Sequence, residues 1–164
     1  MNKTVIAIFI ILFAGFGFYL WQTGRAPKKT AEIAAVDFKD ISYKLDGRGV
    51  NLTDGGIKYF GNEAKGDFDG DGLEDIAFLL TYEGGGSGTF FYVAAALKTT
   101  AGYSGTNAIL LGDRISPETT EFRDGEIIVN YADRKPSEPM TARPSVGVSR
   151  YLKVEGGALV EAKR

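Results

Sequence analysis

The chain begins with one long apolar run and continues as short apolar runs separated by glycine turns. From Thr4 to Gly24 there is no charged residue, and Val5 to Trp21 is almost wholly apolar. A helix of this length spans roughly 31 Å at ~1.5 Å per residue, which matches the ~30 Å hydrocarbon core of a bilayer. The pattern predicts one N-terminal transmembrane helix within residues 1–24, followed by a linker over 25–35.

The apolar run fits two kinds of targeting segment. A cleaved signal peptide needs a small-x-small site soon after the run, whereas the sequence continues Gln22-Thr-Gly-Arg-Ala-Pro-Lys-Lys29. We therefore favour an uncleaved, single-pass anchor in the cell membrane. Three basic residues follow the run and only Lys3 precedes it, so the positive-inside rule alone would put the rest of the chain in the cytoplasm.

After residue 35, helical periodicity is weak and short β-rich runs dominate. Asp-Gly and Gly-Gly pairs separate several of them, as expected for two-residue hairpin turns. The predicted strands are Ile41 to Leu45, Ile57 to Phe60, Ile76 to Tyr82, Thr89 to Leu97, Ala108 to Leu111, Thr120 to Arg123, Glu126 to Tyr131, Val148 to Val154 and Ala158 to Ala162.

The segments Ile76 to Tyr82 and Thr89 to Leu97 are predicted to form the central hairpin of the fold. Both are apolar at nearly every residue, so both faces of that hairpin should be covered. The segment Asp133 to Pro144 contains three prolines and is predicted to be a long surface loop. We expect residues 36–164 to form one mainly β domain with few short helices, built as an antiparallel sandwich, barrel or rolled sheet.

Composition removes several kinds of chemistry. The chain has no cysteine and no histidine, which excludes thiolate and imidazole ligands and the Ser-His and Cys-His forms of catalysis. All 21 acidic residues lie after residue 30, together with 15 of the 19 basic ones. An acidic domain of this kind repels phosphate backbones, so we expect no nucleic-acid partner.

The most specific motif is the acidic segment Asp67-Phe-Asp-Gly-Asp-Gly-Leu-Glu-Asp75. Its aspartates stand at positions 1, 3, 5 and 9, and Gly72 at position 6 permits a sharp turn. Calcium takes about six to eight oxygen ligands, and alternate spacing lets Asp67, Asp69 and Asp71 point inward together. An EF-hand would have a glutamate at position 12, where this chain has Phe78, so the loop should lead into a strand. The predicted calcium ligands are Asp67, Asp69, Asp71, the carbonyl of Leu73, and Asp75 directly or through water.

This loop resembles the calcium loops of FG-GAP, VCBS and dockerin-like proteins over Gly66 to Leu80. Over Tyr59 to Leu152 the chain resembles a recurring type of small bacterial envelope protein. The stretches that carry this resemblance are YFGNEAKGDFDGDGLEDIAFLL, GGSGTFFYVAAAL, GTNAILLGDRI, IIVNYADRKPSEPM and PSVGVSRYL. That type sometimes occurs beside a domain like the membrane-bound inhibitor of c-type lysozyme. The resemblance implies an anchored or secreted location and brings no activity with it.

Three further segments are candidate sites. Gly84-Gly-Gly-Ser-Gly88 lacks the lysine and the helix of a phosphate-binding loop, so we interpret it as a hairpin turn. Asp113-Arg114 and Asp133-Arg134-Lys135 favour surface ion pairs of little energetic consequence. The alternative is a recognition patch beside the proline loop, including Glu138 and Tyr151.

The sequence leaves three functions open. We favour an extracytoplasmic domain, in the periplasm or on the cell surface, because modest calcium sites fill at extracellular calcium levels. It would be a binding or structural module with one structural calcium ion, without catalysis, and its envelope protein partner is unknown. The alternatives are an envelope inhibitor or sensor, and a metal-dependent hydrolase that uses the ion as a Lewis acid.

Overall fold

The computed structural model describes residues 36–163. The predicted anchor (1–24) and linker (25–35) lie outside the described residues. Within the described part, no helix is long and apolar enough to cross a membrane.

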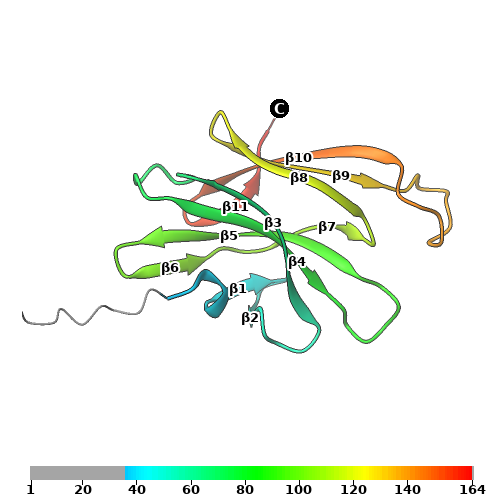
Figure 1. The fold of residues 1–164 in the computed structure, drawn as a ribbon, viewed down its shortest axis with the longest axis horizontal. Coiled ribbons are helices and arrows are strands. Elements are labelled where there is room, and N and C mark those ends of the chain that lie inside the picture. The colour runs from blue at the N-terminus through cyan, green and yellow to red at the C-terminus, as the bar shows by residue number, and fades with distance from the viewer. Residues whose placement is uncertain (1–35, 164) are drawn as a thin grey trace, which may run out of the picture. The chain divides into compact units, whose positions relative to one another are not determined.

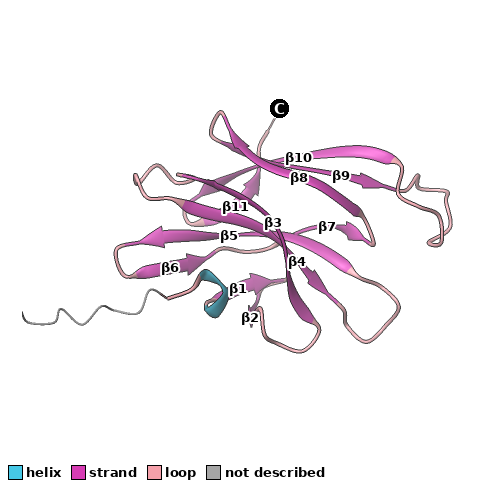
Figure 2. Cartoon of the chain, in the orientation of Figure 1, coloured by secondary structure: helices cyan, strands magenta, loops and turns pink. Residues whose placement is uncertain are grey.

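Residues 36–163 form a mainly β domain of eleven strands with one 3₁₀ helix, Phe38–Asp40 (Figure 2). No α-helix occurs among these residues, which confirms the predicted β class. The strands are β1 (Ser42–Leu45), β2 (Arg48–Asn51), β3 (Ile57–Gly66), β4 (Asp75–Tyr82), β5 (Phe90–Thr99), β6 (Gly102–Gly105), β7 (Ile109–Asp113), β8 (Ser116–Arg123), β9 (Glu126–Asp133), β10 (Val146–Glu155) and β11 (Ala158–Glu161).

The strands form three antiparallel sheets. A central sheet has the order β3-β4-β5-β6, with β7 also paired to β5, and an outer sheet has the order β11-β10-β9-β8. The hairpin of β1 and β2 forms the third sheet. Figure 1 shows the central sheet between the outer sheet and this hairpin, so the domain is layered.

The central hairpin of β4 and β5 is buried on both faces, as its apolar sequence predicts. Successive side chains of a strand point to opposite faces. On β4, Ala77 and Leu79 therefore join the core shared with the outer sheet, while Phe78 and Leu80 join the core beneath the β1–β2 hairpin. The β4–β5 hairpin thus lies between two separate cores and contributes side chains to both; we call it the shared wall.

The second core is rich in aromatic side chains. The Phe78 ring lies 5.2 Å from the Tyr43 ring, 5.4 Å from the Phe38 ring and 5.6 Å from the Tyr59 ring, measured between ring centroids. Tilted and edge-on ring contacts of this kind add to the free energy of burial. They fix the β1–β2 hairpin and the 3₁₀ helix against the central sheet.

In each of three hairpins, the turn consists of two residues with positive φ. Asp46-Gly47 has φ values of 48° and 79°, Asp124-Gly125 has 55° and 78°, and Gly156-Gly157 has 57° and 78°. These values fit the type I′ turn, whose twist matches that of the flanking strands. The predicted hairpins at Asp124-Gly125 and Gly156-Gly157 are confirmed.

The two large sheets approach each other closely at β3 and β8. A Cβ atom built on Gly66, the last residue of β3, would lie 2.3 Å from Cδ1 of Phe122 on β8. Only a residue without a side chain fits against this ring. The acidic loop begins at the next residue, so it starts at a tightly packed junction of the two sheets.

Candidate functional site

The acidic loop joins β3 to β4, as the sequence predicts. Phe68 is buried in the core of the two large sheets, and its ring centroid lies 4.9 Å from that of Phe122. The neighbouring Asp67 and Asp69 are exposed. A single apolar side chain therefore anchors the loop while the carboxylates beside it face solvent.

Backbone N–H groups curl the loop around the carboxylate of Asp67. Its Oδ1 accepts hydrogen bonds from the N–H of Gly70 at 2.8 Å and of Asp71 at 3.0 Å, and its Oδ2 accepts one from Gly72 at 2.9 Å. Gly70 and Gly72 have φ values of 82° and 86°, a conformation that favours glycine. The two glycines thus allow the tight path that the spacing predicts.

The structure brings three of the predicted ligands together. One carboxylate oxygen from each of Asp67, Asp69 and Asp71 lies within 4.8 Å of the others, and all three residues are exposed. The loop continues through Leu73, whose N–H donates to Oδ1 of Asp71 at 2.8 Å. Three carboxylates this close repel one another, so the cluster can hold a hard cation.

Asp75 does not belong to this cluster of three and is fully buried, with 0% of its surface exposed. Its Oδ2 accepts the N–H of Phe68 at 2.8 Å, and its Oδ1 accepts the N–H of Lys98 at 2.7 Å. Burial raises the pKa of the Asp75 carboxyl, and the charges of Asp69 and Asp71 act in the same direction, although the two hydrogen bonds oppose them. Asp75 therefore ties the loop to the end of β5, a role that the motif spacing does not reveal.

The twelfth position of the loop is Phe78, which is fully buried in the second core. The loop thus leads into a strand and offers no glutamate at this position, as predicted. Any further ligands would have to be the Leu73 carbonyl, Asp75 or water.

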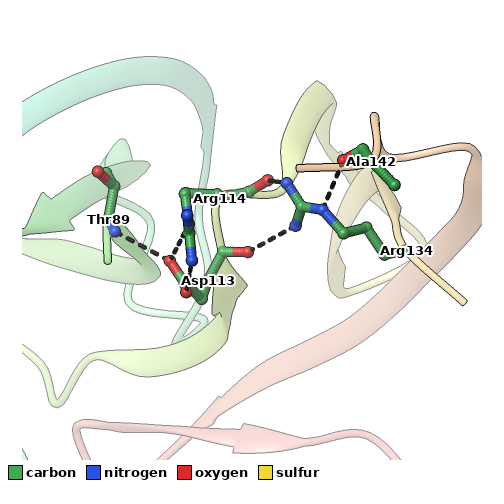
Figure 3. Close-up of polar contacts among 5 residues, drawn as sticks. All are labelled: Thr89, Asp113, Arg114, Arg134 and Ala142. Atoms are coloured by element: carbon green, nitrogen blue, oxygen red, sulfur yellow. Dashed lines mark hydrogen bonds and ion pairs between the residues drawn. The ribbon is translucent and has the colours of Figure 1, made fainter. Parts of the chain in front are cut away.

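A second polar cluster lies at the opposite end of β4 and β5 from Asp75 and centres on Arg134 (Figure 3). Its Nε donates to the Ala142 carbonyl at 2.7 Å. Its Nη1 and Nη2 donate to the carbonyls of Asp113 at 3.1 Å and Arg114 at 3.0 Å. The sequence predicts a surface ion pair or a recognition patch for Arg134. In the structure its guanidinium group instead donates hydrogen bonds to backbone carbonyls of two segments. We call residues 134–145, which join β9 to β10, the clamped loop.

Asp113 and Arg114 form the predicted ion pair. Arg114 Nη2 lies 3.0 Å from Asp113 Oδ2, and the N–H of Thr89 donates to Asp113 Oδ1 at 2.9 Å. Hydrogen bonds from Arg114 hold the pKa of the Asp113 carboxyl below its ordinary value, and Thr89 and Arg134 act in the same direction. An open groove of about 310 Å³ lies beside this cluster, and Met140 and Glu138 of the clamped loop line part of it.

The glycine-rich segment 84–88 connects β4 to β5 and is a hairpin connection, as predicted. A Cβ on Gly84 would lie 2.9 Å from the Tyr82 hydroxyl, and one on Gly88 would lie 2.9 Å from Cε2 of Phe90. These two glycines are explained by aromatic rings that pack against the backbone.

Comparison of the chain with protein-family models, curated proteins and solved structures found no match. No relative therefore supplies an activity, a substrate or a partner for either cluster.

Proposed function

We propose that the chain is a membrane-anchored, extracytoplasmic β domain that binds one structural calcium ion and serves as a binding or structural module of the cell envelope. The observation that carries this proposal is the convergence of Asp67, Asp69 and Asp71 in a loop with ligand spacing.

Calcium would act by removing the repulsion among these carboxylates. Asp67, Asp69 and Asp71 would bind it through their side chains and Leu73 through its carbonyl. Asp75 would contribute directly or through water while it holds the loop to β5. Calcium accepts more protein oxygens and a looser geometry than magnesium, which keeps more of its water. The ion would therefore stabilise the entry into β4 at the junction of the two sheets.

The location rests on two features of the sequence. The charge-free segment Thr4 to Gly24 has the length of a membrane-spanning helix. The absence of a ligand at position 12 suits a site of modest affinity, which fills at the calcium concentrations found outside the cytoplasm. The first feature favours a domain held at a membrane, and the second favours its outer face.

Thermal unfolding with and without metal tests the calcium site. We expect ~1 mM calcium to raise the melting temperature of the full chain in mild detergent by roughly 5 °C or more over EDTA, and more than ~1 mM magnesium does, because a ligand of the folded state stabilises it by mass action. Asp71→Asn keeps the oxygen that accepts the Leu73 N–H but removes a charge, so it should lose this response.

Asp54→Asn is the matched control. Asp54 is an exposed aspartate between β2 and β3, at the end of β3 opposite the acidic loop. Its Oδ2 accepts the N–H of Asn51 at 2.8 Å, so asparagine keeps an acceptor there as it does at position 71. This variant should keep the full calcium response. Equal melting temperatures of the wild type in calcium and in EDTA would show that the acidic loop is a turn and not a metal site.

A further inference from the structure

The clamped loop is the second feature of the domain with a distinct chemistry, and it is independent of the proposed calcium site. In Figures 1 and 2 it extends past the ends of β9 and β10. Loops that project from a rigid scaffold are where binding residues concentrate.

The conformation of the clamped loop is fixed by hydrogen bonds from both of its ends. Arg134 binds the Ala142 carbonyl within the loop and the carbonyls of Asp113 and Arg114 outside it (Figure 3). The Ser145 N–H donates to the Asp133 carbonyl at 2.8 Å and closes the base of the loop. A loop already held in one conformation loses less entropy when it binds a partner.

Two turns shape the part of the loop that faces solvent. The N–H of Glu138 donates to the Lys135 carbonyl at 3.0 Å, and that of Ala142 donates to the Pro139 carbonyl at 2.9 Å. The second turn presents Met140, whose exposed fraction is 44%. A methionine of this exposure is a large apolar group with no core to bury it.

The basic side chains of the loop are available to a partner, apart from Arg134. Arg143 is exposed, and it makes no hydrogen bond or ion pair within residues 36–163. The Lys135 side chain is 65% exposed, and its Nζ lies 4.0 Å from Glu138 Oε1. An ion pair at this distance with an exposed lysine contributes little free energy, so a partner carboxylate can replace Glu138.

The charge of the loop is opposite to that of the domain that carries it. Residues 36–163 contain 20 acidic and 14 basic residues, whereas the clamped loop contains three basic residues and one acidic residue. A basic projection on an acidic body attracts and orients an acidic partner surface and repels a basic one.

We propose that the clamped loop is a docking element for an acidic protein surface that has an apolar pocket for Met140. Arg143 and Lys135 meet carboxylates of the partner around this pocket. Methionine and arginine are enriched in protein interfaces, where an apolar centre is surrounded by polar contacts. Arg134 is a positioning residue that presents these groups and does not contact the partner.

Selection from a random dodecapeptide phage library against the immobilised full chain in mild detergent tests this proposal. We expect the enriched peptides to combine aspartate or glutamate with a leucine, phenylalanine or other large apolar residue. Synthetic copies should bind Arg143→Glu and Met140→Ser about tenfold more weakly than the wild type. Their affinity for the wild type should also fall as sodium chloride is raised.

Arg48→Glu is the matched control, because Arg48 is an exposed arginine on β2 of the hairpin layer. It makes the same charge change as Arg143→Glu away from the clamped loop, so peptide affinity should be unchanged. Unaltered melting temperatures of all three variants will show that they fold. The proposal is overturned by enriched peptides without acidic residues, by peptides that bind the loop variants and the wild type equally, or by a library with no enrichment.

Discussion

At the scale of single residues, several positions are determined by contacts that lie far away in the sequence. Gly66 must be glycine because the Phe122 ring occupies the place of a side chain. Asp75 can be buried at the start of β4 because the N–H groups of Phe68 and Lys98 donate hydrogen bonds to its carboxylate. A buried carboxylate without such partners would cost much free energy. In each case the residue type follows from the junction that it occupies.

Substitution of Gly66 tests the tightness of the β3–β8 junction. We expect Gly66→Ala to lower the free energy of unfolding by about 1–3 kcal/mol, since its Cβ would overlap the Phe122 ring unless one strand shifts. Gly147→Ala is the control, because a Cβ at Gly147 meets no atom within 4 Å and its φ is not positive. Urea denaturation of both variants measures the difference. A Gly66→Ala protein as stable as the control would show that the ring moves aside at little cost.

At the scale of elements, the long apolar strands were predictable and the short polar ones were not. The predicted central hairpin and the strands of the outer sheet are confirmed by their pairing. The sequences of β2 (RGVN) and β6 (GYSG) carry no strand pattern of their own. They are strands because β1 and β5 supply hydrogen-bonding partners.

In the candidate sites too, contacts within one short segment were predictable and contacts between distant segments were not. Alternate spacing was enough to predict that Asp67, Asp69 and Asp71 converge, because a short loop brings its own residues together. The hydrogen bond from Lys98 to Asp75 and the contacts of Arg134 join segments about 20 residues apart. Charge patterns suggested only ion pairs for Arg134, since backbone carbonyl partners have no signature in a sequence.

The clamp is tested by replacing the arginine with a lysine. Arg134→Lys keeps the charge but cannot donate along a fixed fork to three carbonyls. We expect amide hydrogen exchange at Ala142 and Ser145, whose N–H groups are hydrogen-bonded in the loop, to become several-fold faster, because the loop would leave its conformation more often. In the control Arg48→Lys, exchange at these two amides should match the wild type. Unchanged exchange in Arg134→Lys would mean that the turns alone hold the loop.

At the scale of the whole domain, the two large sheets are also linked at the side away from β8. The side chain of Asn107, between β6 and β7, donates to the Leu159 carbonyl at 3.0 Å and accepts the Leu159 N–H at 2.8 Å. The Asn107 amide thus makes the two hydrogen bonds to Leu159 of β11 that a neighbouring strand would otherwise make. The backbone around it also bonds to β1, through the N–H of Lys44 to the Thr106 carbonyl at 3.0 Å and the N–H of Ala108 to the Lys44 carbonyl at 2.8 Å.

Removal of this amide should loosen the outer sheet at β11. We expect Asn107→Ala to lower the free energy of unfolding by about 1–3 kcal/mol, because two partly buried backbone groups lose their partners. Amide hydrogen exchange should become faster at Leu159 before it changes in β4. The control is Asn51→Ala, at an exposed asparagine on β2. Exchange at Leu159 equal to that of the wild type would show that water takes the place of the amide without cost.

The shared wall of β4 and β5 makes the domain indivisible. Every residue from Asp75 to Thr81 is buried, and successive apolar side chains along the strand belong alternately to one core and to the other. A fragment that ended after β7 would expose one face of the wall, and a fragment that began at β3 would expose the other. No stable half can therefore be excised or exchanged with another protein, and insertions or fusions are tolerated only where they leave both faces covered.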